Sequence, residues 1–124
     1  RIGWVSLAPA TEPQRRGPAL PTAVPSYAEI EWDRDRYPYL ATVRWLNARA
    51  ALFVVQTRDQ HEMAVLAVDV ANRHTRVLHR ETSNHWLNID QSVPYVLRGG
   101  EAFLWSSESD GDYRIELRSA ADGS

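Results

Sequence analysis

Residues 50–81 read AALFVVQTRDQHEMAVLAVDVANRHTRVLHRE, and this stretch decides the fold. Three short apolar runs, at 50–57, 62–70 and 75–81, are separated by polar clusters of four residues each. Short runs rich in Val and Leu between polar turn clusters are typical of β-strands. A helix over 62–70 is the alternative, because Met, Ala and Leu are good helix formers. A strand buried on both faces fits that run better, because both sets of alternating residues are apolar: Ala64, Leu66 and Val68, and Met63, Val65 and Ala67.

The same pattern of short apolar runs separated by polar clusters extends along the chain in both directions. Strand therefore follows strand at hairpin spacing, with no convincing amphipathic helix between them, and the sequence predicts an all-β antiparallel meander. The predicted strands are 27–32, 39–46, 50–57, 62–70, 75–81, 93–97, 101–107 and 112–118. The predicted turns are Asn47–Arg49, Arg58–His61, Ala71–His74, Arg98–Gly100 and Ser109–Gly111.

Composition limits the functions that the chain can have. Its 124 residues, of which 44% are hydrophobic, are enough for one modest domain. A net charge of −2 provides no long-range field for nucleic acid or anionic lipid, so neither is predicted as a partner. The absence of cysteine excludes disulfides and thiolate chemistry and leaves the compartment unknown. No apolar run approaches the roughly 18 residues of a membrane span, and no membrane partner is predicted.

The N-terminal quarter differs from the rest. Residues 1–8 begin with Arg1 rather than Met and resemble a strand already under way, so we expect a piece of a longer protein. Residues 9–25 carry five of the seven prolines. Because proline fixes φ and lacks an N–H donor, that segment is predicted to be a loop or linker.

An internal repeat appears when the chain is shifted by 51 positions. The shift superposes Ala51–Phe53 on Ala102–Leu104, and Leu66 on Leu117. A period near 50 with several strands per unit is typical of β-propeller blades, so about two blades are predicted. The predicted parts form one structural domain: 1–36 is a closing strand of a preceding blade plus a proline-rich linker, 37–92 is a complete blade, and 93–124 is a partial next blade.

The repeat also bears on the acidic cluster Glu108, Asp110 and Asp112. The counterpart of Asp110 is Asp59, but this residue lies between an arginine and a glutamine, which a metal site would not share. A hairpin tip is favoured, in which the Asp bonds its own backbone and Gly111 supplies a positive φ. A weak calcium site or a partner contact are the alternatives, although calcium needs six or more oxygens. No metal or cofactor is predicted.

Two further groups of residues suggest chemistry. The histidines are predicted to be exposed turn or strand-end residues rather than metal ligands, because a metal site would need same-face partners. The serines beside Glu108 are predicted to be structural, because a catalytic serine needs an oriented His and an oxyanion hole. No catalytic residue is predicted. These groups are His61, His74, His79 and His85, and Ser106, Ser107 and Ser109.

A set of short motifs gives the chain a family resemblance. Tyr39–Trp45 reads YLATVRW, an Arg-x-Gln follows at Arg58, and Phe103–Gly111 contains Phe-Leu-Trp-x-Ser-Glu-x-x-Gly. In order and spacing these motifs resemble the β-propeller region of the dipeptidyl peptidase IV-like prolyl oligopeptidase family, over about residues 37–118. The family-motif residues are Trp45, Arg58, Gln60, Trp86, Ser107, Glu108 and Gly111.

The resemblance implies a parent serine exopeptidase that removes Xaa-Pro or Xaa-Ala dipeptides. In that family the propeller precedes an α/β-hydrolase domain, which carries the Ser-Asp-His triad. This chain contains no Gly-x-Ser-x-Gly nucleophile elbow and no Glu-Glu pair. We therefore expect a non-catalytic propeller fragment that gates the access of peptides. Its implied partners are the hydrolase domain, the remaining blades and, in the parent, a peptide substrate.

Several residues have two interpretations. Arg58 and Gln60 could lie at a blade edge and face a cavity or a neighbour, but the prediction favoured here is a fixed Arg58 guanidinium that bonds carbonyls of the next blade. The tryptophans are predicted to pack between blades rather than to form a stacking platform, because large aromatic side chains bury well. The resemblance makes Asn88, Ile89 and Asp90 a candidate cavity-facing loop, and the alternative is a polar connection between blades. The tryptophans concerned are Trp32, Trp45, Trp86 and Trp105.

Two isolated blades would leave strand edges and apolar faces open. Self-association by edge pairing or strand exchange is therefore predicted. The alternative functions are a non-enzymatic β-propeller that binds a protein partner and a small complete β domain with a binding groove.

Overall fold

The structure is a computed structural model that describes residues 27–124. The predicted strand at 1–8 and the linker at 9–25 lie outside these residues. The described part of the chain is all-β apart from one short 3-10 turn, and none of its helices is long and apolar enough to cross a bilayer. The elements are β1 (Tyr39–Asn47), β2 (Ala50–Gln56), β3 (Glu62–Asp69), β4 (His74–Thr82), β5 (Tyr95–Val96), β6 (Ala102–Ser107), η1 (Ser109–Gly111) and β7 (Arg114–Ser119).

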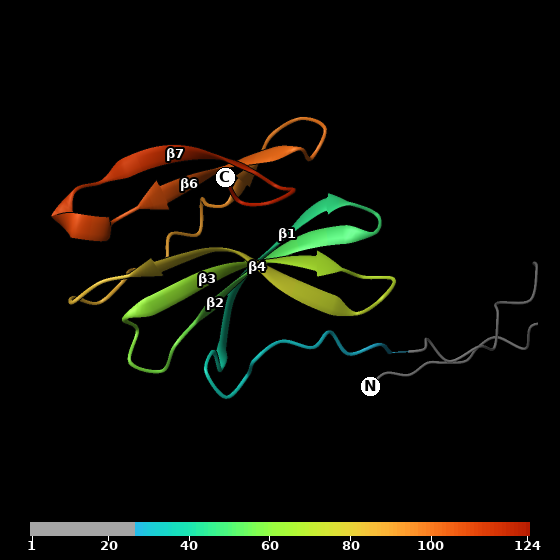
Figure 1. Cartoon of the computed structure of the whole chain (residues 1–124), viewed down its shortest axis with the longest axis horizontal. Coiled ribbons are helices and arrows are strands. Elements are labelled where there is room, and N and C mark those ends of the chain that lie inside the picture. The colour runs from blue at the N-terminus through green and yellow to red at the C-terminus, as the bar shows by residue number, and fades with distance from the viewer. Residues whose placement is uncertain (1–26) are drawn as a thin grey trace, which may run out of the picture.

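The strands form two antiparallel sheets, which lie one above the other in Figure 1. Sheet A has four strands in the order β1-β2-β3-β4, and sheet B has three in the order β5-β6-β7. Each strand pairs with the next one along the chain, so the predicted all-β meander is confirmed. Two stacked meander sheets are the arrangement expected of about two propeller blades.

Two predicted strands need correction. The strand predicted at 27–32 is wrong, because that segment is a loop that reaches sheet A mainly through side chains. The strand predicted at 93–97 is reduced to Tyr95–Val96. Pro94 explains the shortening, since proline has no N–H to donate to a strand ladder.

The main core lies between the two sheets. Leu52, Val54 and Val65 of sheet A face Phe103 and Trp105 of sheet B, and all five are at most 3% exposed. Burying apolar surface of this kind is the dominant favourable contribution to folding. The remaining buried members of the core are Met63, Leu78, Leu87, Val93 and Ala120.

A second, smaller core lies on the opposite face of sheet A, which we call its outer face. The segment 27–38 runs along this face, on the side away from sheet B (Figure 1). Tyr37 is 2% exposed and packs with Val55 and Leu66, and the ring of Trp32 meets Phe53 edge-on at 5.8 Å. The loop thus serves as a third layer that covers part of sheet A.

The 51-residue repeat is confirmed in the backbone pairing. Ala51 pairs with Val68, and Ala102 pairs with Ser119, so β2-β3 and β6-β7 share one register after the shift. The turns also correspond. Gln60 has a φ of 63°, Gly111 has a φ of 80°, and each backbone N–H bonds the carbonyl three residues earlier.

Candidate functional site

The connection between the sheets, residues 83–93, is fixed to sheet A near both ends. Leu87 is 3% exposed, its N–H donates to Gln60 O at 2.9 Å, and its carbonyl accepts from Gln56 Nε2 at 2.9 Å. Near the other end Val93 is 7% exposed in the core between the sheets, and Arg44 of β1 donates to Gln91 O. Two buried anchors thus hold a short exposed loop between them.

That loop contains the candidate residues Asn88, Ile89 and Asp90, all of which are exposed. They line a small groove between the sheets, with a volume of about 10 Å³, whose walls also include Glu81 and Trp105. Asp90 Oδ1 accepts hydrogen bonds from the side chain and backbone of Ser92, which lower the pKa of the carboxyl below its ordinary value. The loop therefore presents a carboxylate and an amide at the mouth of the groove.

A buried carboxylate joins the two sheets on the inner side of this groove. Glu81 of β4 is 4% exposed, and its Oε2 accepts from Trp105 Nε1 at 2.6 Å. Its Oε1 accepts from Ser107 Oγ at 3.2 Å and from the backbone N–H of Glu108. Three donors from sheet B therefore satisfy one carboxylate from sheet A, as a buried polar group requires.

His79 is the other ionisable group at the junction of the sheets. Its ring meets Trp105 edge-on at 6.0 Å, and its Nε2 is buried without a hydrogen-bond partner. Burial is the main reason that the pKa of His79 is lowered, and the charge of Arg118 lowers it further. His79 is half-buried inside β4, so the prediction that all histidines are exposed turn or strand-end residues is wrong for it.

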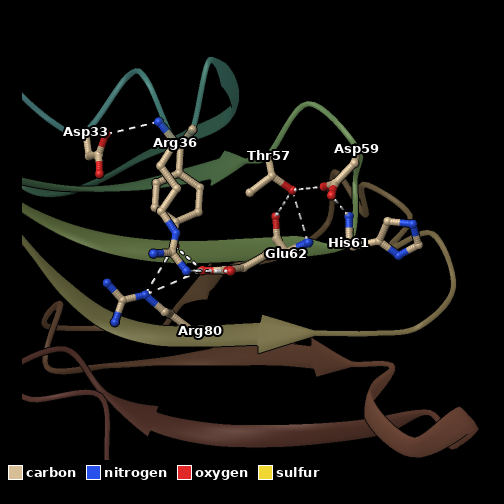
Figure 2. A network of polar contacts seen from close by, with 8 residues as sticks. Asp33, Arg36, Thr57, Asp59, His61, Glu62 and Arg80 are labelled. Atoms are coloured by element: carbon tan, nitrogen blue, oxygen red, sulfur yellow. Dashed lines mark hydrogen bonds and ion pairs between the residues drawn. The ribbon is translucent and has the colours of Figure 1, made fainter.

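A second polar network lies between the segment 27–38 and the outer face of sheet A, as Figure 2 shows. Glu62 accepts from Arg36 at 2.9 Å and from the hydroxyl of Tyr37, which in turn accepts from Arg80 Nε at 3.1 Å. Burial raises the pKa of the Tyr37 hydroxyl, and the bond to Glu62 adds to this effect. Burial also opposes ionisation of Glu62, but the bonds from Arg36 and Tyr37 outweigh it and lower the pKa of the carboxyl.

The tip of the β2-β3 hairpin has the geometry of a turn. Asp59 Oδ1 accepts from Thr57 Oγ1 at 2.6 Å and from the backbone N–H of His61 at 3.2 Å. These bonds, with that from Thr57 the larger effect, lower the pKa of the exposed Asp59. Within residues 27–124, no group of three or more His, Cys, Asp or Glu gathers that could hold a metal ion. Asp59 is therefore used to shape the turn.

Residues 22–124 match the family model described as the dipeptidyl peptidase IV (DPP IV) N-terminal region. The chain belongs to this family. The match begins before the described residues and includes both sheets, so the whole structure described above belongs to the DPP IV N-terminal region.

The structure places the motif residues of this DPP IV-like chain in separate locations. Ser107 is buried and Glu108 half-buried beside Glu81, at the end of the groove. Gly111 lies in the exposed tip of the β6-β7 hairpin. The groove thus brings together Glu108 of the motif and the loop 88–90, but not the remaining motif residues.

The Arg-x-Gln residues lie at the tip of the β2-β3 hairpin and are both exposed. The guanidinium of Arg58 lies 6.0 Å from the ring centroid of Tyr39, within sheet A rather than between sheets. The backbone carbonyl of Gln60 anchors Leu87. The contact of Arg58 thus differs from the predicted one with carbonyls of the next blade, whereas Gln60 does position the connection through its backbone.

The predicted packing of tryptophans between blades holds only in part for this DPP IV-like chain. Trp105 is 3% exposed between the sheets, and Trp32 packs on the outer face of sheet A. Trp45 and Trp86 are 61% and 73% exposed, so neither packs between the two sheets of residues 27–124. Trp45 pairs with Ala51 on the outer face of β1, beyond the part that segment 27–38 covers.

Three contributors to these networks were missed by sequence reasoning: Glu81, Tyr37 and Glu62. Glu81 meets Trp105 across 24 positions of the chain, and no local pattern signals such a pairing. Glu81 stands between Arg80 and Thr82 in a largely polar strand, so its local sequence carries no signal of burial.

Proposed function

We propose that this chain is a non-catalytic part of the propeller wall of a DPP IV-like serine exopeptidase, where it helps to gate the access of peptides to a hydrolase domain. The observation that carries the proposal is the family match over residues 22–124. The hydrolase domain, the remaining blades and the peptide substrate would be partners contributed by the parent protein.

The geometry of the junction between the sheets supports a wall rather than a reactive centre. Glu81 is fully occupied by its three donors, and Ser107 donates to that carboxylate rather than to a histidine base. A nucleophilic serine would need an adjacent base oriented by a third group. The fixed loop 88–90 at the mouth of the groove supports a role in touching the peptides that pass.

The test uses the native protein, purified from its source with an antibody raised against this chain. We expect a mass several times 14.1 kDa and hydrolysis of an Xaa-Pro amide that a serine-directed inhibitor abolishes. We also expect the enzyme to cleave short peptides and to leave the same N-terminal dipeptide intact on a folded protein. The 124-residue chain alone is the control and should not hydrolyse the amide.

Two results would contradict the proposal. A native mass near 14.1 kDa would mean that no hydrolase domain accompanies the chain. A large native protein without amide hydrolysis would favour the alternative of a propeller that binds a protein partner.

A further inference from the structure

His79 lies on the face of β4 that is directed at sheet B. It pairs with Val65 of β3, a member of the core between the sheets. Directly opposite residues of an antiparallel pair have their side chains on the same face of the sheet. The ring of His79 also meets Trp105 of β6 edge-on at 6.0 Å. A titratable side chain thus lies at the junction of the two sheets, beside apolar side chains of both.

The Nε2 atom of His79 is the unusual feature of this junction. It is buried, and no hydrogen-bond partner reaches it within residues 27–124. A neutral imidazole can leave Nε2 without a proton, because its single N–H can be on Nδ1. The imidazolium has an N–H on both nitrogens. Protonation of His79 would therefore create a buried donor without an acceptor, which is costly.

The charged groups that act on His79 come from β4 and β7. Glu81 of β4 already accepts hydrogen bonds from three donors of sheet B. Glu116 of β7 is also occupied, because Arg118 Nε donates to it at 2.9 Å. Burial and the charge of Arg118 disfavour the imidazolium and outweigh the two carboxylates, so the pKa of His79 lies below its ordinary value of 6.5.

We propose that His79 makes the junction of the two sheets sensitive to acid: the neutral ring keeps the junction closed, and protonation loosens sheet B from sheet A. The Nε2–H of the imidazolium gains hydrogen bonds to water only if the junction opens. The groove lined by loop 88–90 and Glu108 lies at this junction, with Trp105 in its wall. A fall in pH therefore loosens the groove as well.

This property belongs to the two described sheets. Residues within 27–124 are sufficient to bury Nε2, so no other segment is needed for that burial. The proposal is also independent of the proposed gating function, because it concerns the packing of the sheets and not the passage of a peptide.

The direction of the effect follows from the lowered pKa. The opened or unfolded chain binds a proton on His79 before the closed chain does as the pH falls. The stability that the neutral ring contributes is therefore complete above pH 6.5 and is lost as the pH falls from 6.5 through the lowered pKa. Carboxylates titrate at lower pH, so a range from about pH 7.5 to about pH 5.5 separates His79 from them.

Nuclear magnetic resonance of the 124-residue chain tests the titration of His79 directly. The ring resonance of His79 is identified by its loss in the His79→Phe variant. We expect this resonance to titrate with a midpoint below pH 6.5. The variant keeps an aromatic ring beside Trp105 but cannot take up a proton, so it is also the reference for the next measurement.

Hydrogen exchange measures the opening of the junction. Trp105 Nε1–H and the backbone N–H of Glu108 both bond Glu81 across the sheets, so their exchange with solvent reports separation there. Protection is taken relative to the intrinsic exchange rate at each pH. Between about pH 7.5 and about pH 5.5 it should fall at least about threefold in the natural chain. It should stay constant in His79→Phe.

Two further variants make the comparison specific. His79→Gln also has a side chain that does not titrate, and it provides the same comparison if the phenyl ring prevents folding. His74→Gln is the matched control, because His74 is exposed at the first position of the same strand. This control should keep the full pH response of the natural chain.

Three results would overturn the proposal. The first is a His79 midpoint at or above pH 6.5. The second is equal protection of Trp105 and Glu108 at both pH values in the natural chain. The third is a loss of protection that a folded His79→Phe or His79→Gln variant retains in full, which would assign the acid sensitivity to another group.

Discussion

The outer faces of the two sheets occupy the same position in the repeat and have different surroundings. Leu66 of sheet A is 3% exposed, whereas its counterpart Leu117 of sheet B is 63% exposed. The segment 27–38 covers the first face through Tyr37 and Trp32. Within the described part of the chain, no segment covers the second face in this way.

This comparison shows that the burial of a side chain depends on the layers around its sheet and not on the repeated sequence alone. Both faces carry apolar residues at equivalent positions, with Phe53 and Leu66 in sheet A and Leu104 and Leu117 in sheet B. The register of the backbone is also the same. What differs is whether a further segment lies on the face, so the same leucine makes a different contribution to stability in each sheet.

The largest expected effect concerns this leucine pair. Leu66→Ala should lower the free energy of unfolding by about 3 kcal/mol, because it opens a cavity beneath Tyr37. Leu117→Ala should cost less than about 0.5 kcal/mol, because the side chain is exposed. Urea denaturation measures both losses. Equal losses would mean that segment 27–38 does not cover sheet A as described.

A smaller effect is expected where the two sheets meet. Glu81→Ala should lower the free energy of unfolding by about 2 kcal/mol, because Trp105 Nε1 and two further donors lose their acceptor. Glu81→Gln keeps an amide oxygen as acceptor and should lose less. Urea denaturation compares the two variants, and an equally stable Glu81→Ala protein would show that the polar link adds nothing to the apolar core.

The smallest effect concerns the pH dependence of stability that arises from Glu62, which bonds segment 27–38 to sheet A. The pKa of Glu62 in the folded protein is below its ordinary value of 4.5, so the unfolded chain binds a proton first on acidification. The stability that Glu62 contributes is therefore complete above pH 4.5 and is lost as the pH falls toward the folded pKa.

The measurement is the unfolding free energy of the natural chain and of Glu62→Gln between neutral pH and the acid limit of folding. The variant should lose less stability over this range than the natural chain does. Asp69→Asn is the control, because Asp69 also has a lowered pKa but is exposed and bonds within its own turn. Parallel pH profiles for Glu62→Gln and the natural chain would disprove the linkage.

Local patterns predicted most of the sheet structure. The runs at 50–57, 62–70 and 101–107 are short, largely apolar and bounded by polar turns, and β2, β3 and β6 occupy them. The segment 27–32 was mistaken for a strand because its aromatic and aliphatic residues have β propensity. Its role is instead set by Trp32, which packs by side chain on a sheet distant in sequence. The blade boundaries 37–92 and 93–124 stay a prediction.

The candidate site was less predictable, because it depends on contacts between distant strands. The loop 88–90 was found through a family resemblance, whereas Glu81 escaped because its partners are more than twenty positions away. The exposure of Trp45 and Trp86 was not predicted from the sequence for a similar reason. Burying a tryptophan side chain is favourable, but the surrounding layers decide whether it is buried.

The matched turns at Gln60 and Gly111 show that two copies of a repeat can keep one backbone path with different side chains. Both residues have a positive φ, which glycine adopts freely and glutamine adopts at a cost. A duplicated unit therefore inherits a backbone path first, and each copy can replace the side chains of its turns while that path is kept. In this chain one copy uses the backbone at that point to anchor Leu87 of the next segment. A tight turn of one repeat unit thus also anchors the connection to the next unit.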